Sequence, residues 1–295
     1  MLKGIVTALL TPFTESGGLC RGCLEQLVEL QLRAGVSTLF ISGTYGEGVI
    51  TSVKTREELL KAAIEIAPGK LSILPHIGTS DMEVVLHLAR LAKDLGYRAV
   101  SVVGPIYHVP TKQGLAKYFN HVARAGVDIV IYNNRGRQGY NISPDDFEFI
   151  VKEVPSVVGI KDTSYDVDQL LEYVKRFGAR YTVAGAGDNL LYYTFAIGAP
   201  AHICGISNLF PELAVKLYRA VAEGNHQRAV DLQYKINGIR KLFRKFGVET
   251  QEILRAALKF RGVDPGYPPL QLSIDFSTQQ LSELKKLVED VLREL

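Results

Sequence analysis

Lys161 is the residue whose surroundings point most directly to chemistry, because it ends the apolar run at residues 157–161. If this run is a strand, alternation places Lys161 on the same face as Val157 and Gly159. Val158 and Ile160 then face the surrounding helices. A lysine among apolar groups loses solvation, which lowers its pKa and yields the free amine that attacks a carbonyl carbon. The pattern therefore indicates Schiff-base chemistry, with Gly159 leaving room for the lysine stem.

A tyrosine ends a second apolar run in the same way. Tyr132 closes residues 129–132 and shares a face with Val130. A phenol at that place can exchange protons with a substrate held by Lys161, provided that a neighbour relays the proton. Thr44 and Tyr107 are the candidate relay. Most of the 14 tyrosines are expected to be ordinary core aromatics. Tyr132 and Tyr107 are singled out only by their positions in the chain.

Some of the charged and glycine-rich segments near these runs have a structural interpretation as well as a functional one. Arg137 can hold a substrate carboxylate by two parallel hydrogen bonds, or it can form a surface salt bridge. Lys161 itself would pair with Asp162 at the surface if its strand were out of register. The glycine-rich residues 43–48 expose backbone N–H groups as anion sites do, but they lack the lysine of a P-loop.

The elements that must position these residues alternate regularly. Short β-branched runs, each followed by an amphipathic segment of helical period, predict eight strand-helix units. Eight such units with right-handed crossovers close most simply into a (β/α)8 TIM barrel, whose chemistry lies at the carboxyl ends of the strands. The predicted strands are residues 5–9, 38–41, 72–76, 99–103, 129–132, 157–161, 181–185 and 202–205.

The rest of the chain is helical and contains no predicted strand. We expect the α/β barrel to occupy residues 1–224 as the catalytic domain, and residues 225–295 to form a C-terminal helical extension of the same unit. Its predicted helices are residues 227–246, 251–261 and 278–295. A length of 295 residues fits one large barrel of this kind.

Composition excludes several classes of function. Hydrophobic residues make up 47% and charged residues 22%, which is typical of globular proteins and not of disordered ones. The net charge of +3 provides no field that would hold a nucleic acid, and no apolar run approaches the length of a membrane span. Residues 1–13 lack a cleavage site and resemble a strand more than a signal peptide, so we expect a cytoplasmic protein without nucleic-acid or membrane partners.

Cysteine and histidine patterns give no sign of a metal. Three cysteines cannot all pair, so we expect reduced thiols. Cys20 and Cys23 form a C-x-x-C pair, which is expected to lie in the first turn of a helix. Only Cys204 could complete a site, and the six histidines show no ligand spacing.

Together these residues resemble the dihydrodipicolinate synthase / N-acetylneuraminate lyase family of class I aldolases, which includes 2-keto-3-deoxygluconate aldolases. The likeness covers essentially the whole chain, including the helical extension. The motifs that carry it, in order, are G-x-x-T-A-L-x-T-P-F at residues 4–13, G-T-Y-G-E at 43–47, Tyr107, Y-N-x-x-G-R at 132–137 and G-I-K-D at 159–162.

The resemblance implies a catalytic set. Lys161 would form a Schiff base with the ketone of pyruvate or another 2-keto acid, and Tyr132 would carry protons to and from it. Thr44 would link Tyr132 to Tyr107, which in this family commonly reaches into the neighbouring subunit's site.

The resemblance also implies substrate contacts and an assembly. The N–H groups of Thr44 and Tyr45 would receive the pyruvate carboxylate, and the carbonyl of Ile203 would help to orient the tyrosine. Arg137 matches the arginine that binds the carboxylate of the aldehyde partner in the family's synthases. A homotetramer made of two dimers is implied, with no metal or organic cofactor beyond the covalent lysine.

Three positions depart from the family pattern. Tyr45 stands where a small hydroxyl residue is usual, Arg135 where a proline is usual, and Thr55 where an acidic or amide residue is common. Arg135 would add a positive charge close to the catalytic tyrosine. Arg137 favours a 4-hydroxy-tetrahydrodipicolinate synthase of lysine biosynthesis, acting on pyruvate and aspartate semialdehyde. Tyr45 and Arg135 leave a 2-keto-3-deoxy sugar acid aldolase or a related lyase open, and a non-catalytic keto-acid-binding barrel as a further alternative.

Overall fold

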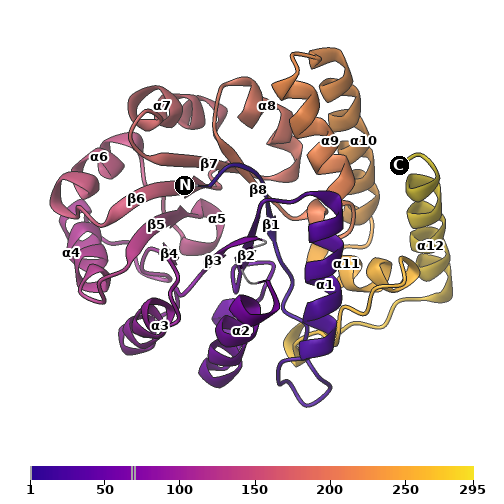
Figure 1. Ribbon diagram of the computed structural model, residues 1–295, viewed down its shortest axis with the longest axis horizontal. Coiled ribbons are helices and arrows are strands. Elements are labelled where there is room, and N and C mark those ends of the chain that lie inside the picture. Colours follow the sequence, from indigo (N-terminus) through magenta and orange to yellow (C-terminus); the bar gives the residue numbers. More distant parts are fainter. Residues whose placement is uncertain (1, 68, 70) are drawn as a thin grey trace.

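The computed structural model describes residues 2–67, 69 and 71–295, and it contains a barrel of eight parallel strands surrounded by helices (Figure 1). Each predicted strand overlaps an observed one. The fold class predicted from the sequence is therefore confirmed. The strands are β1 (Gly4–Ala8), β2 (Thr38–Ile41), β3 (Ser72–Pro75), β4 (Ala99–Val103), β5 (Asp128–Asn133), β6 (Val157–Asp162), β7 (Thr182–Ala186) and β8 (Ala201–Cys204).

Helices connect successive strands and continue beyond the last one. Those of the barrel are α1 (Arg21–Ala34), α2 (Val53–Ile66), α3 (Met82–Asp94), α4 (Lys112–Ala123), α5 (Arg135–Gln138), α6 (Pro144–Glu153), α7 (Val167–Phe177), α8 (Leu191–Ala196) and α9 (Pro211–Ala222). The extension contains α10 (His226–Arg244), α11 (Thr250–Phe260) and α12 (Thr278–Arg293). Short 3₁₀ turns are η1 (Gly48–Ile50), η2 (Asp188–Leu190), η3 (Ile206–Asn208) and η4 (Leu270–Leu272).

Local signals in the sequence explain where the helices begin and end. Asp81 caps α3 by accepting a hydrogen bond from the N–H of Glu83, and Ser143 forms a reciprocal capping box with Asp146 at the start of α6. Gly35 ends α1 at a φ of 81°, a left-handed conformation in which a side chain would be strained.

The barrel closes between β3 and β4. Hydrogen-bonded neighbours run in the order β3-β2-β1-β8-β7-β6-β5-β4, and a bridge between His76 and Ser101 joins the two ends. The His76 side chain stabilises this junction. Its Nδ1 lies 3.1 Å from the backbone carbonyl oxygen of Ser42, and its Nε2 accepts a hydrogen bond from the N–H of Val103 at 3.3 Å. The carboxyl ends of all eight strands thus surround one opening.

Side chains of the strands separate into an inner layer and an outer core, with one departure from the expected alternation. Gly159 and Lys161 face the interior as predicted. A bulge between β5 and β6, however, changes the alternation at the start of β6: Val157 faces outward, as Ile160 does, and Val158 faces inward. The predicted faces of Val157 and Val158 are therefore wrong. Gly159 is required by the neighbouring strand, because a Cβ there would lie 2.4 Å from the Thr182 oxygen.

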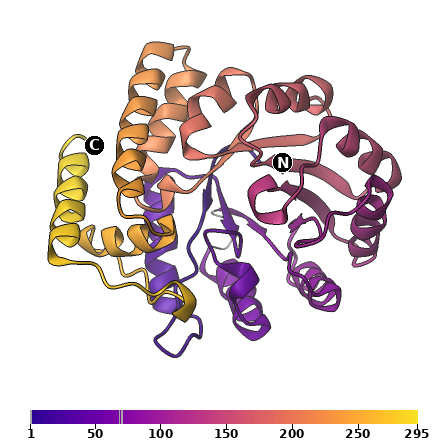
Figure 2. The ribbon, with the colours of Figure 1, turned by 180° about the vertical axis from the view of Figure 1, so that it is seen from behind.

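The C-terminal helices lie along one side of the barrel (Figures 1 and 2). Buried residues of α10, including Ala229, Ile236 and Phe243, belong to the same core as α9, and the start of α11 reaches the barrel opening. Among the described residues, no helix combines the length and apolar character needed to cross a bilayer.

The cysteines differ from expectation. Cys20 is the N-cap of α1 and Cys23 lies in its first turn, as predicted, but the two form a disulfide. An odd number of cysteines does not prevent two of them from pairing. The Cα atoms of Cys20 and Cys23 are 5.3 Å apart, a separation that a disulfide can span. The prediction of reduced thiols therefore holds only for Cys204, which is free and buried.

Candidate active site

Lys161 lies near the carboxyl end of β6 and is only 4% exposed. Its Nζ is 3.7 Å from the centre of the Tyr132 ring and 4.1 Å from that of Phe40. Within the described part of the chain, no carboxylate lies within ion-pair distance of it. Burial therefore lowers the pKa of Lys161 below its usual 10.5, an effect that Tyr132 partly opposes, and this favours the free amine.

The alternative pairing of Lys161 with Asp162 at the surface is wrong. Asp162 is buried on the opposite side of β6, where its carboxylate accepts hydrogen bonds from Asn133 at 2.8 Å, Gln169 at 3.1 Å and Ser164 at 2.7 Å. Alternation along the strand thus directs the lysine inward and its acidic neighbour away from it.

Tyr132 stands beside Lys161 in register on β5, and polar side chains surround its hydroxyl. Thr44 Oγ1 lies 3.0 Å from the phenol oxygen, as predicted for the relay, and the amide of Asn134 donates to the same oxygen at 2.7 Å. Burial acts to raise the pKa of Tyr132, but the Lys161 ammonium and the hydrogen bond with Thr44 outweigh it, so the pKa lies below 10.0. This phenol therefore releases its proton more readily than an ordinary tyrosine, as a proton carrier requires.

His76 packs edge-on against the Tyr132 ring, with their centres 5.6 Å apart. Burial lowers the pKa of His76 to about 3, and the charges of Arg56 and Lys161 act in the same direction. The imidazole is consequently neutral at physiological pH, and it shapes the site without adding charge to it.

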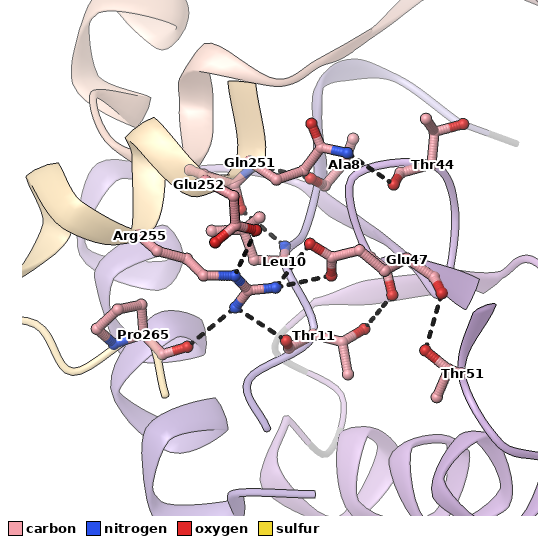
Figure 3. Close-up of polar contacts among 12 residues, drawn as sticks. Ala8, Leu10, Thr11, Thr44, Glu47, Thr51, Gln251, Glu252, Arg255 and Pro265 are labelled. Carbon is pink, nitrogen blue, oxygen red and sulfur yellow. Dashed lines mark hydrogen bonds and ion pairs between the residues drawn. The ribbon is translucent and has the colours of Figure 1, made fainter. Parts of the chain in front are cut away.

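The loop of residues 43–48 presents backbone donors beside these side chains. Among the described residues, nothing accepts a hydrogen bond from the N–H of Thr44 or of Tyr45, which leaves both available to an anion. The same loop is fixed from α11: Gln251 donates to the Thr44 carbonyl at 3.4 Å, and Arg255 contacts both carboxylate oxygens of Glu47 at 2.7 Å (Figure 3).

Two adjoining cavities open at the rim. We call the one that contains Lys161 the lysine cavity; its volume is about 300 Å³, and its lining includes Thr163, Asp188 and Ile203. The second, which we call the apolar cavity, has a volume of about 280 Å³ and is lined largely by apolar atoms, including those of Val49, Ile50, Ile106 and Leu272. The wall that both share is formed by Thr44, Tyr132, Asn134, Arg137, Glu249 and Gln251.

Tyr45 occupies the far side of the lysine cavity. Its ring lies over Gly205, where an added Cβ would be 2.2 Å from the ring carbon Cζ. Burial, Asp188 and Tyr165 raise the pKa of this phenol well above its usual value, so Tyr45 is neutral. A neutral phenol in the lysine cavity can exchange hydrogen bonds with an uncharged hydroxyl group.

Arg137 lines both cavities and forms an ion pair with Glu249 of the same chain. Its Nη2 contacts both carboxylate oxygens of Glu249, at 2.9 and 3.0 Å, and both side chains are exposed. Arg135 lies exposed at the start of α5, and Asn134 faces the cavities in its place. The expectation that Arg135 adds its charge beside Tyr132 is therefore wrong.

The remaining predicted residues have different positions. Ile203 lies in the inner layer and lines the lysine cavity. Tyr107 is 91% exposed, with a φ of 77°, so one copy of the chain does not bring it to Thr44. Its role stays a prediction that concerns a second copy. Thr55 belongs to the first turn of α2, where its N–H is capped by Ser52.

No group of three or more His, Cys, Asp or Glu side chains able to hold a metal occurs among residues 2–67, 69 and 71–295. The expectation of a reaction without metal or organic cofactor stays a prediction.

Comparison with known proteins decides the family. The model of the dihydrodipicolinate synthetase family matches residues 1–291. The chain belongs to this family. Its members are class I lyases that use a lysine Schiff base, so the resemblance and the enzyme class predicted from the sequence are confirmed.

Relatives of the chain within this family carry more than one name. The 4-hydroxy-tetrahydrodipicolinate synthase of Thermotoga maritima is 33% identical over 267 residues, which are 89% of this chain and 90% of that protein. The structure of Ruminococcus gnavus sialic acid aldolase superposes with a TM-score of 0.93 at 26% identity, covering 99% and 98% of the two chains. That of Aquifex aeolicus dihydrodipicolinate synthase gives 0.89 at 28% identity, with the same coverage.

Sequence reasoning missed three residues of the shared wall. Asn134 had a usable signal, because it follows Tyr132 by two positions and alternation continues past the end of β5. Glu249 and Gln251 had none, since they come from the helical extension and no local pattern indicates that it reaches the barrel opening.

Proposed function

We propose that this chain is a class I lyase that forms a Schiff base between Lys161 and the ketone of pyruvate or a related 2-keto acid. The observation that carries the proposal is the buried Lys161 amine, held 3.7 Å from the ring of a tyrosine whose hydroxyl contacts Thr44. The N–H groups of Thr44 and Tyr45, which have no acceptor in the described part of the chain, support a role as receptors for the substrate carboxylate.

The proposed steps use only groups of this site. The amine of Lys161 adds to the ketone carbon, and loss of one water molecule leaves an imine. Tyr132 then takes a proton from the adjacent carbon, which gives an enamine. The enamine carbon bonds to the carbonyl carbon of an aldehyde, whose oxygen receives the proton, and water releases the product by hydrolysing the imine. Lyase activity is the same sequence in reverse.

Trapping with borohydride tests the proposal. In the presence of pyruvate, reduction of the imine should attach a carboxyethyl group permanently to Lys161, and mass spectrometry of the digested protein locates it. Lys161→Ala should give no adduct while its circular dichroism spectrum remains that of the wild type. A wild-type protein without any adduct on Lys161 would overturn the proposal.

For the second substrate, we propose aspartate semialdehyde, which makes the chain a 4-hydroxy-tetrahydrodipicolinate synthase of lysine biosynthesis. The support is the name carried by curated relatives at 29–33% identity over most of the chain. Arg137 lines the lysine cavity and would hold the carboxylate of this aldehyde once Glu249 releases it.

Two observations favour a second candidate, a 2-keto-3-deoxy sugar acid aldolase. Glu249 already supplies a carboxylate to Arg137, and Tyr45 presents a neutral phenol to the cavity; an uncharged hydroxylated aldehyde suits this wall better than an anionic one. Condensation assays with pyruvate and either aspartate semialdehyde or glyceraldehyde decide between the candidates. Activity with glyceraldehyde alone would establish the second.

We further propose that the protein is a cytoplasmic homotetramer built from two dimers, in which Tyr107 of one copy completes the site of another. Exposed apolar side chains near the apolar cavity support an interface there: Tyr107 is 91% exposed, Val109 74% and Val49 49%. Sedimentation analysis of the wild type and of Tyr107→Phe, combined with activity, tests this assembly.

A further inference from the structure

Asn134 has contacts that the proposed reaction has not yet used. It follows β5 directly, is 7% exposed and belongs to the wall between the two cavities. Its amide nitrogen lies 2.7 Å from the Tyr132 oxygen and 3.5 Å from Thr44 Oγ1. The shorter contact is closer than that of Thr44 to the same phenol, 3.0 Å.

Hydrogen-bond accounting gives this contact a direction. An amide N–H can only donate, so Asn134 occupies a lone pair of the phenol oxygen and cannot receive the phenol's proton. That proton is then directed to Thr44 Oγ1, to the Lys161 amine or to a bound substrate. A donor to the oxygen also favours the phenolate over the phenol, because hydrogen bonds to a charged oxygen are stronger than those to a neutral one.

We propose that Asn134 is a positioning residue that directs the Tyr132 proton and stabilises the tyrosine oxygen while that proton is away. This inference rests on the proposed function, since it concerns the proton transfer within the Schiff-base reaction. It adds an amide donor to the hydroxyl groups that were predicted to tune the tyrosine.

The charge of Lys161 also lowers the pKa of Tyr132, whereas the remaining charged or titratable groups around Tyr132, among the described residues, do not contact its oxygen. Lys161 lies over the ring face, and the neutral His76 packs against the ring edge. Tyr165 stands across the lysine cavity, and burial raises the pKa of its phenol. Arg137 is held by Glu249 in the cavity wall. The pH dependence of proton transfer therefore reports the coupled pair of Lys161 and Tyr132, which Asn134 biases from outside.

A half-reaction isolates the step. With pyruvate alone in deuterated water, the imine on Lys161 loses a methyl proton to Tyr132, the proton is replaced by a deuteron from solvent, and the deuteron returns to carbon. Each cycle exchanges one C–H for one C–D with no oxidant, reductant or aldehyde. Proton NMR of the pyruvate methyl group measures its rate.

Two variants of nearly equal size distinguish positioning from packing. Asn134→Leu removes the donor, and Asn134→Asp replaces it with an acceptor that retains the tyrosine proton. We expect exchange to fall roughly 10- to 100-fold in the first variant, as loss of a hydrogen bond to a charged group implies. The ascending limb of the rate against pH should move up by about one unit, and further in Asn134→Asp. The Michaelis constant for pyruvate should change little in Asn134→Leu.

The outcomes separate the inference from the proposed function. A wild-type borohydride adduct together with unshifted pH profiles in both variants would overturn the role of Asn134 and leave the Schiff-base lyase standing. Equal profiles for Leu and Asp with lowered thermal midpoints would show a packing role and overturn it too. Absence of a wild-type adduct would overturn the proposed function, and the inference with it.

Discussion

Replacing Arg255 with methionine is the sharpest test of how the helical extension supports the barrel. Arg255 is 3% exposed and contacts Glu47 at 2.7 Å and Glu252 at 3.5 Å, while its Nη1 donates to the carbonyls of Thr11 at 3.1 Å and Pro265 at 3.2 Å (Figure 3). Methionine keeps most of the volume and removes the charge. Glu47 and Glu252, both buried, then lose the positive charge that they share.

The magnitude follows from this burial. Removing one partner of a buried ion pair costs about 3–5 kcal/mol. At about 2 °C per kcal/mol for a chain of this size, the thermal midpoint of Arg255→Met should fall by roughly 6–10 °C. Arg33→Met is a suitable control, because the Arg33–Glu29 pair is exposed and should contribute no more than about 1 kcal/mol.

The loss should also depend on pH. Burial raises the pKa of Glu47 to about 7, although Arg255 acts to lower it. The native protein therefore binds more protons than the unfolded chain between the ordinary pKa of 4.5 and about 7, so this group's contribution to stability falls as pH rises through that range. Without Arg255 the pKa of Glu47 rises further. The loss of stability of Arg255→Met relative to the wild type should therefore be larger at about pH 8 than at about pH 5.5.

Thermal melts followed by far-ultraviolet circular dichroism measure both effects, since the chain has no tryptophan for fluorescence. The double variant Glu47→Gln/Arg255→Met should recover part of the loss, because one of the two unpaired charges is gone. A midpoint within about 2 °C of the wild type at both pH values would refute the reasoning, as would equal losses at the two pH values.

Two further substitutions test the site. Tyr132→Phe should lower turnover by about 10²–10⁴ while the borohydride adduct on Lys161 still forms, and turnover close to the wild type would exclude the phenol as proton carrier. Gly205→Ala should destabilise the protein by about 1–3 kcal/mol, because the added Cβ would lie 2.2 Å from the Tyr45 ring. Adding Tyr45→Ser should restore the thermal midpoint, and a double variant no better than the single one would contradict this contact.

The fold could be predicted because its signals are local and repeated. Each strand is a short β-branched run, and caps such as Ser143 mark where helices begin. The faces of Lys161 and Tyr132 followed from alternation, which holds at the carboxyl ends of β5 and β6. Val157 and Val158 were misplaced because a bulge inserts one residue, and no pattern within a single strand indicates a bulge.

The parts of the site that could not be predicted depend on distant contacts. Whether Arg137 is free or paired depends on Glu249, which is 112 positions away and comes from the helical extension. The Cys20–Cys23 disulfide is local, yet a count of cysteines over the whole chain concealed it. Contacts of long sequence separation are set by packing of whole elements, and the sequence around either partner does not encode them.

The joining of residues 43–48 to α11 has a consequence for synthesis on the ribosome. Glu47 emerges early, but its partner Arg255 lies 208 positions later, and Gln251, which contacts Thr44, lies 207 positions later. A nascent chain that already contains Lys161 and Tyr132 still lacks the partner of Glu47, which belongs to the same loop as Thr44. Chains grow at about 5–20 residues per second, so Arg255 and Gln251 are added at least about ten seconds after this loop is made. We therefore expect this loop to reach its active-site conformation only once nearly the whole polypeptide has been made.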